Sequence, residues 1–264
     1  MFLKEYDSSN RAFALHVTIT CKGKKKFRAY ASDYGRANSK YADRVIEVDG
    51  KRTIFFSFPV SPKKLGIVIY DESDNNSKDF DVQIMEAPLT TYNVWLDDNT
   101  REFLELAIPF CQMSGFTQAS PNGSLFATQN EKFKIVYFPV IRDFMSGKVH
   151  NTPARIGHQS GKIEVAKAKF DGYTIPMRLI ILLHEFSHKY KNPKIGLKIE
   201  DEFGADINAL YIYLGLGFSK IDAICVFANV FLKAQSDGNI ARMRKIMNYI
   251  QRFENGEYAQ KNLN

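Results

Sequence analysis

Five residues, His184-Glu185-Phe186-Ser187-His188, carry the clearest chemical pattern in this chain of 264 residues. On an α-helix, residues four positions apart differ by only about 40° around the axis, so the imidazoles of His184 and His188 can reach one metal ion. Glu185 is rotated by about 100° from His184, which makes it a poor ligand but a good neighbour for a metal-bound water. The pattern therefore predicts a zinc site with a general base beside it.

A second acidic pattern, Glu202-Phe203-Gly204-Ala205-Asp206, begins fourteen residues after His188. A catalytic zinc ion needs three protein ligands and one open position. We expect Glu202 to be the third ligand, because the chain can turn back at Asn192-Pro193 and return within this separation. Asp206, one helical turn later, would accept the free ring N–H of a ligand histidine and fix its tautomer.

Two neighbouring acids, Glu200 and Asp201, compete with Glu202 for the third ligand position. Neither is followed by an acidic residue four positions later, since Gly204 follows Glu200 and Ala205 follows Asp201. The helical spacing therefore favours Glu202.

The two patterns together, at 184–188 and 202–206, resemble the gluzincin metallopeptidases, in the branch that contains the membrane peptidase HtpX and the soluble minigluzincins. The likeness covers roughly residues 95–264. It implies a zinc-dependent endopeptidase with a zincin-like domain and Zn²⁺ as cofactor. It also implies an antiparallel edge strand that pairs with an extended peptide or protein substrate, a role that a predicted strand at 162–170 could fill. Lys189 stands where zinc peptidases usually have an uncharged residue, and the missing membrane spans favour the soluble branch.

In such an enzyme Glu185 removes a proton from the zinc-bound water and later hands it to the leaving amine. A group that stabilises the oxyanion is needed as well. The candidates are Tyr211, Tyr213, Arg242 and His158, and the sequence does not choose among them.

Residues 1–90 are expected to form a separate all-β module, an antiparallel sandwich without a catalytic pattern. Short segments rich in β-branched and aromatic residues alternate there with turn-forming residues, and no helix intervenes. Asp49-Gly50 is expected to form a tight hairpin turn, and Lys24-Lys25-Lys26 a solvated hairpin tip. The predicted strands are 12–20, 27–31, 45–48, 53–58, 65–70 and 80–85.

Residues 91–264 are expected to form an α+β domain of the zincin type. Asp98 or Asn99 would cap a first helix, which ends before Gly115. The helix that begins at Thr174 is apolar on nearly all sides and is expected to be buried. The predicted helices are about 100–114, 174–190, 200–214, 220–235 and 240–254, and the predicted strands are 124–128, 132–138 and 162–170.

Composition excludes several classes of protein. With 45% hydrophobic and 25% charged residues, the chain is typical of a globular protein and not of a disordered or fibrous one. Its three cysteines are far apart and form no CxxC pair, which argues against a disulfide framework or a cysteine zinc site. The formal charge of +7 permits weak attraction to acidic surfaces, but no aromatic-basic motif accompanies it, so we expect no specific nucleic-acid site.

The chain contains no predicted membrane span or signal peptide. Its most apolar run, at 179–183, ends at a histidine and a glutamate, and residues 1–7 lack an apolar stretch. We therefore expect a cytoplasmic protein.

A second hypothesis comes from another functional class, a structural or assembly protein such as a bacteriophage virion component whose zincin-like domain has incidental or lost activity. The richness in Lys, Asn, Phe, Tyr and Ile, with a β-module joined to a compact enzyme-like domain, resembles proteins of crAss-like phages. This hypothesis implies a place in a larger assembly, location in the virion, and a protein partner for residues 1–90.

Overall fold

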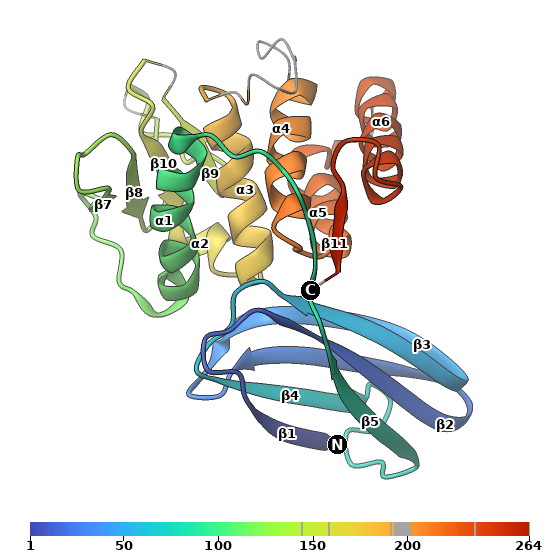
Figure 1. Ribbon diagram of the computed structural model, residues 1–264. Coiled ribbons are helices and arrows are strands. Elements are labelled where there is room, and N and C mark those ends of the chain that lie inside the picture. The colour runs from blue at the N-terminus through green and yellow to red at the C-terminus, as the bar shows by residue number, and fades with distance from the viewer. Residues whose placement is uncertain (144, 158, 191, 193–201, 235, 264) are drawn as a thin grey trace. The chain divides into compact units, whose positions relative to one another are not determined.

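The computed structural model describes residues 1–143, 145–157, 159–190, 192, 202–234 and 236–263. The chain divides into two compact units. Unit 1 contains residues 1–91 with two short segments, at 217–219 and near the C-terminus, and unit 2 contains residues 92–216 and 220–261. The fold is mixed α/β, with a large antiparallel sheet in unit 1 and helices beside a mixed sheet in unit 2 (Figure 1).

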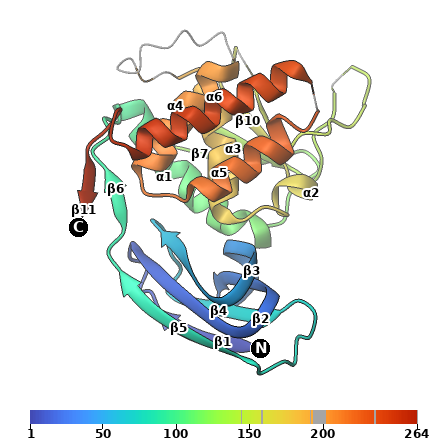
Figure 2. The ribbon, with the colours of Figure 1, turned by 90° about the vertical axis from the view of Figure 1, so that its right-hand side faces the viewer.

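The strands of unit 1 belong to one antiparallel sheet of five strands, in the order β1-β4-β2-β3, with β5 also paired to β2. β2 pairs with β3 at 13–20 and 24–33, and its other edge pairs with β5 at 14–21 and with β4 at 27–33 (Figure 2). The expectation of an antiparallel module is confirmed, whereas a sandwich stays a prediction. The bounds are β1 Phe2–Asp7, β2 Phe13–Asp33, β3 Arg36–Phe58, β4 Lys64–Asp71 and β5 Phe80–Ala87.

The predicted hairpin turn at Asp49-Gly50 is wrong, because both residues lie inside β3. Thr20 of β2 pairs with Lys51, and the next paired residue of β2, Lys24, faces Asp49. Three residues of β2 therefore lie opposite Gly50, whose φ of 72° is in the left-handed region. The extra residues belong to β2, so β2 is the bulged strand, and Gly23 within it also has a positive φ, of 69°. The Asp-Gly pair therefore lies opposite a bulge instead of forming a turn, and glycine adopts the positive φ at position 50 without strain.

The predicted hairpin tip at Lys24-Lys25-Lys26 is wrong for the same reason, because the run lies within β2. Lys24 forms an ion pair with Glu47 of β3, with Nζ and Oε2 2.9 Å apart. The chain reverses instead between Asp33 and Arg36, where β2 ends and β3 begins.

Unit 2 contains a mixed sheet of four strands in the order β7-β8-β10-β9. β8 is antiparallel to β7 and parallel to β10, and β9 is antiparallel to β10. The bounds are β7 Ser124–Ala127, β8 Lys134–Phe138, β9 Ala154–Ile156 and β10 Ile163–Ala166.

The strand predicted at 162–170 is not an edge strand. It ends at Ala166, where the chain enters the short helix α2 (Lys167–Phe170), and β10 has β8 on one side and β9 on the other. Its main-chain groups are therefore paired on both edges, which excludes the addition of a substrate strand to β10. The edge strands are β7 and β9. The one beside β10 is β9, which is too short to give a periodic signal in the sequence.

Two helices cover one face of this sheet. α1 (Asp98–Met113) packs Phe110 against Tyr137 of β8, with ring centroids 5.4 Å apart. α3 (Ile175–Ser187) lies beside α1, where Phe186 and Phe103 stack at 4.3 Å. The N-cap of α1 is Asp97, and its Oδ1 accepts from Thr100 N at 2.8 Å. The predicted caps, Asp98 or Asn99, are wrong by one or two residues.

α3 is buried on nearly all sides, as its sequence predicts, and Thr174 is its N-cap. Its neighbours among the later helices are α4 and α5, and α4 in turn contacts α6 (Figure 1). No helix within the described residues is long and apolar enough to cross a membrane. The remaining elements are the 3₁₀-helix η1 (Ser114–Phe116), α4 (Glu202–Gly215), α5 (Lys220–Val226), the π-helix η3 (Phe227–Phe231), α6 (Asp237–Glu254), and β6 (Thr90–Tyr92), which pairs with β11 (Lys261–Leu263).

Candidate metal site

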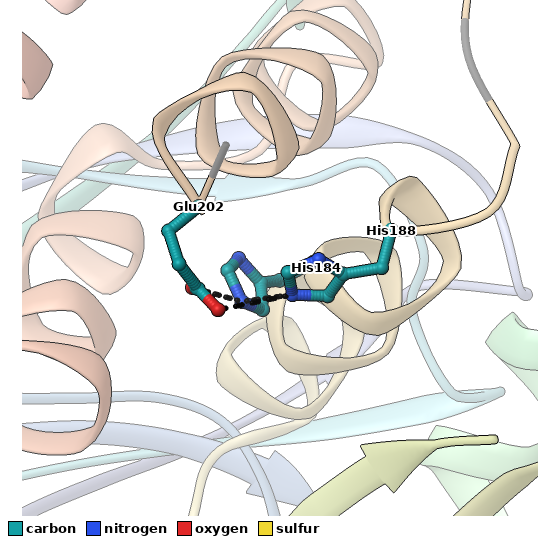
Figure 3. A group of neighbouring side chains, drawn as sticks. All are labelled: His184, His188 and Glu202. Carbon is teal, nitrogen blue, oxygen red and sulfur yellow. Dashed lines mark hydrogen bonds and ion pairs between the residues drawn. The ribbon is translucent and has the colours of Figure 1, made fainter. Parts of the chain in front are cut away.

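Three predicted ligands lie together where α3 ends and α4 begins. His184 is in the last turn of α3, His188 is its C-cap residue, and Glu202 is the first residue of α4 (Figure 3). The two Nε2 atoms are 3.1 Å apart, and the carboxylate oxygens of Glu202 are 3.5 Å from His184 Nε2 and 3.7 Å from His188 Nε2. Ligand atoms placed about 2.1 Å from a tetrahedral ion are about 3.4 Å apart. The His-His-Glu group could therefore hold a metal ion.

The group runs from a buried end to an exposed end. The side chain of His184 is 3% exposed, that of His188 15% and that of Glu202 57%. Phe231, the last residue of η3, stacks on the imidazole of His184 with ring centroids 4.0 Å apart. An ion here would be shielded from water on the His184 side and open on the Glu202 side.

Asp206 lies behind His184, one turn after Glu202 and completely buried. Its Oδ1 is 3.0 Å from His184 Nδ1, close enough for an ion pair, although the ring N–H is misaligned for a regular hydrogen bond. Arg242 of α6 donates from Nε and Nη2 to the two oxygens of Asp206, at 2.5 and 2.7 Å. Arg242 Nη2 also donates to Glu202 Oε2 at 3.1 Å, so one guanidinium holds both carboxylates.

These charges shift the pKa values of the ligands. Burial alone would lower the pKa of His184, but the carboxylates of Asp206 and Glu202 outweigh it and raise the pKa to about 9. Hydrogen bonding to His184 lowers the pKa of Glu202 to about 2. His184 and Arg242 therefore face the carboxylates of Asp206 and Glu202 in one connected group of ion pairs.

Glu185 is also buried, at 9% exposure, and burial raises its pKa to about 7. The positive charge of His184 and a hydrogen bond from the backbone N–H of Ile156 act in the opposite direction. A carboxyl group with a pKa near neutrality can both take up and release a proton under ordinary conditions, which suits a general base.

The contact with Ile156 shows how β9 faces the site. Gly157 N donates to Lys162 O, and Ala166 N donates to Pro153 O, both at 2.9 Å. In an antiparallel pair, hydrogen-bonded residues alternate with residues whose main-chain groups point away. The N–H and C=O groups of Ala154 and Ile156 therefore point away from β10, on the side where Glu185 lies.

The oxyanion candidates are placed as follows. Tyr211 accepts a hydrogen bond from Trp95 N at 3.0 Å through its hydroxyl, so it holds the segment before α1. Tyr213 is completely buried. Arg242 reaches the site, where it is bonded to Asp206 and Glu202. His158 lies outside the described residues, and so do the competing acids Glu200 and Asp201.

Sequence reasoning missed the residues that hold this site together from other parts of the chain. Phe231 is an ordinary core aromatic by sequence, and only the fold brings it onto His184. Asn208 of α4 is buried at 2% exposure and bonds the segment that follows α3. A buried asparagine inside an apolar helix is the one signal that could have identified it.

Lys189, which follows the second histidine, bonds the turn between β9 and β10. Its Nζ donates to Gln159 O at 2.9 Å, in the turn between β9 and β10. It therefore joins the end of α3 to the turn that follows the edge strand.

Comparison with models of known protein families, with curated proteins and with solved structures finds no match for this chain.

Proposed function

We propose that the protein is a zinc-dependent endopeptidase with a zincin-like domain in unit 2. One observation carries the proposal, the convergence of His184, His188 and Glu202 on one point with Glu185 in the same helical turn. Two imidazoles and a carboxylate are a donor set that suits zinc and leave a fourth position open. The order of elements, a helix, a small sheet, the helix of the two histidines and a ligand helix, supports the zincin-like assignment.

A bound zinc ion would polarise a peptide carbonyl and make a water molecule more acidic. Glu185 takes the proton of the attacking water and passes it to the leaving amine, a task that its raised pKa favours. Asp206 orients His184 through Nδ1, and Arg242 keeps Asp206 in place.

The substrate strand in this proposal pairs with β9 instead of β10. The outward main-chain groups of Ala154 and Ile156 offer the hydrogen bonds that an added strand needs, and they lie beside Glu185. A substrate C=O would take the Ile156 N–H from Glu185, which frees the carboxylate to act as the base. The carbonyl of Ala154 accepts from Thr152 Oγ1 at 2.7 Å, a bond that a substrate N–H would replace. An extended peptide on this edge would place one of its peptide bonds next to the general base.

The test compares the full chain with Glu185→Gln in zinc content and in cleavage of an unfolded protein substrate. Glu105→Gln is the matched control, because Glu105 is an exposed glutamate on α1. We expect both variants to keep zinc, and only Glu185→Gln to lose cleavage, by about a hundredfold or more.

Two results would contradict the proposal. Zinc bound by the unmutated chain without any cleavage would exclude the peptidase and favour the assembly protein. Equal cleavage by the Glu185→Gln variant would show that Glu185 is not the general base.

A further inference from the structure

The side-chain amide of Asn208 holds the segment that follows the metal-site helix. Its Nδ2 donates to Ser187 Oγ at 2.8 Å and to Tyr190 O at 3.3 Å. Its Oδ1 accepts from Asn192 N at 3.2 Å. Both N–H groups and the carbonyl oxygen of the amide thus have partners, all of them within residues 187–192.

These bonds join α4 to α3 at a second point beside the metal ligands. Ser187 directly precedes His188, and Asn208 follows Asp206 by two residues on α4. Two packed helices that touch at one polar point can still rotate or slide about it. A second point, on another face of α4, removes that freedom and fixes the distance between His188 and Glu202.

Asparagine is an unusual choice at this position if packing alone matters. It is a poor residue in a helix interior, and a buried amide is costly unless its hydrogen bonds are made. Its neighbours in α4, Ile207, Ala209 and Leu210, are buried apolar residues. An apolar side chain would satisfy packing here, whereas only an amide can bond a hydroxyl, a carbonyl and an N–H together.

We propose that Asn208 is a positioning residue for the metal site. It sets where α3 ends relative to α4, and so brings the imidazole of His188 to 3.7 Å from the carboxylate of Glu202. Metal ligands must lie within about 0.5 Å of their productive positions, so a small shift of the helix end weakens binding. The inference rests on the zinc site of the proposed function and not on peptidase activity.

The experiment measures the zinc affinity of the full chain by competition with a chromophoric chelator, together with thermal stability. Asn208→Ala removes the amide, and Asn208→Asp keeps its shape but puts a carboxylate oxygen opposite the carbonyl of Tyr190. Tyr137→Phe is the matched control, because it removes a buried hydroxyl that lies within hydrogen-bond distance of Ser114 O, at 2.9 Å, and of Asp171 Oδ1, at 2.5 Å, and neither partner is a metal ligand.

We expect both Asn208 variants to bind zinc about three- to tenfold more weakly. This loss of affinity is smaller than the loss expected when a residue that contacts a metal ligand is replaced. Tyr137→Phe should lower thermal stability and leave zinc affinity within about twofold of the unmutated chain. Asn208 variants that bind zinc as tightly as the unmutated chain, while losing stability as the control does, would overturn the inference.

A milder variant covers the case in which the Asn208 variants do not fold. Ser187→Ala removes one of the three hydrogen bonds, and we expect about twofold weaker zinc binding. Unchanged affinity in this variant would assign Asn208 to folding alone and overturn the inference. Zinc binding without cleavage by the unmutated chain would contradict the peptidase but leave this measurement intact.

Discussion

Arg242 donates two hydrogen bonds to Asp206, at 2.5 and 2.7 Å, and so connects α6 to the buried side of the metal site. The same carboxylate lies 3.0 Å from Nδ1 of His184. The Arg242 side chain thus acts on the metal ligand His184 through one intermediate residue. Its pKa is raised, since the carboxylates of Asp206 and Glu202 outweigh the effect of burial, and the guanidinium stays charged.

Replacing Arg242 with Gln should weaken zinc binding by about tenfold, because Asp206 would keep its buried charge without a cationic partner and would hold His184 less firmly. Chelator competition measures the change. Arg252→Gln is the control, since Arg252 lies on the same helix and contacts the exposed Glu257 and the ring of Tyr258, not Asp206 or Glu202. Equal zinc affinity in the two variants would contradict a role for Arg242 at the site.

Removal of zinc should lower the thermal stability of unit 2. An ion present at a hundred times its dissociation constant stabilises the folded state by about 2.7 kcal/mol. We expect a chelator to lower the unfolding temperature of the unmutated chain by several degrees. A His188→Ala variant should show no such shift in unfolding temperature. A shift of equal size in this variant would mean that the ion binds at another site.

Shortening Phe231 to Ala should speed zinc dissociation, because the ring covers the imidazole of His184 and keeps water away from it. Phe231→Leu keeps an apolar side chain over His184, so its rate of zinc dissociation should stay close to that of the unmutated chain. Stopped-flow transfer of zinc to a chelator measures the rate. Phe126→Ala, which removes a ring packed on Phe110, is the control for a general loss of packing.

Replacing Ile156 with Pro should abolish peptide cleavage while zinc is retained. The Ile156 N–H points away from β10, so proline removes this one donor, which bonds Glu185 in the free chain and would turn to the substrate strand, without breaking a ladder bond. Steady-state cleavage and zinc content measure the two effects. Cleavage at an unchanged rate would show that the substrate does not pair with β9.

Much of the local structure could be predicted from residue spacing. Thr174 is the N-cap of α3, and its hydroxyl oxygen accepts a hydrogen bond from Met177 N, three residues later. Helix capping depends only on such a short stretch of sequence, so this cap could be predicted. The strand segments of unit 1 were recognisable by composition. The joining of the first four segments into two long strands, with a bulge of β2 opposite Gly50, was not, because turns and bulges use the same residues.

Residue spacing was enough to place His184 and His188 on one helix face, and Glu202 and Asp206 on another, because helical periodicity is a local property. The packing of distant elements, by contrast, places Arg242 behind Asp206 and leaves β9 at the sheet edge beside β10. These partners are distant in the chain. Their meeting depends on how helices and strands pack, which local spacing does not encode.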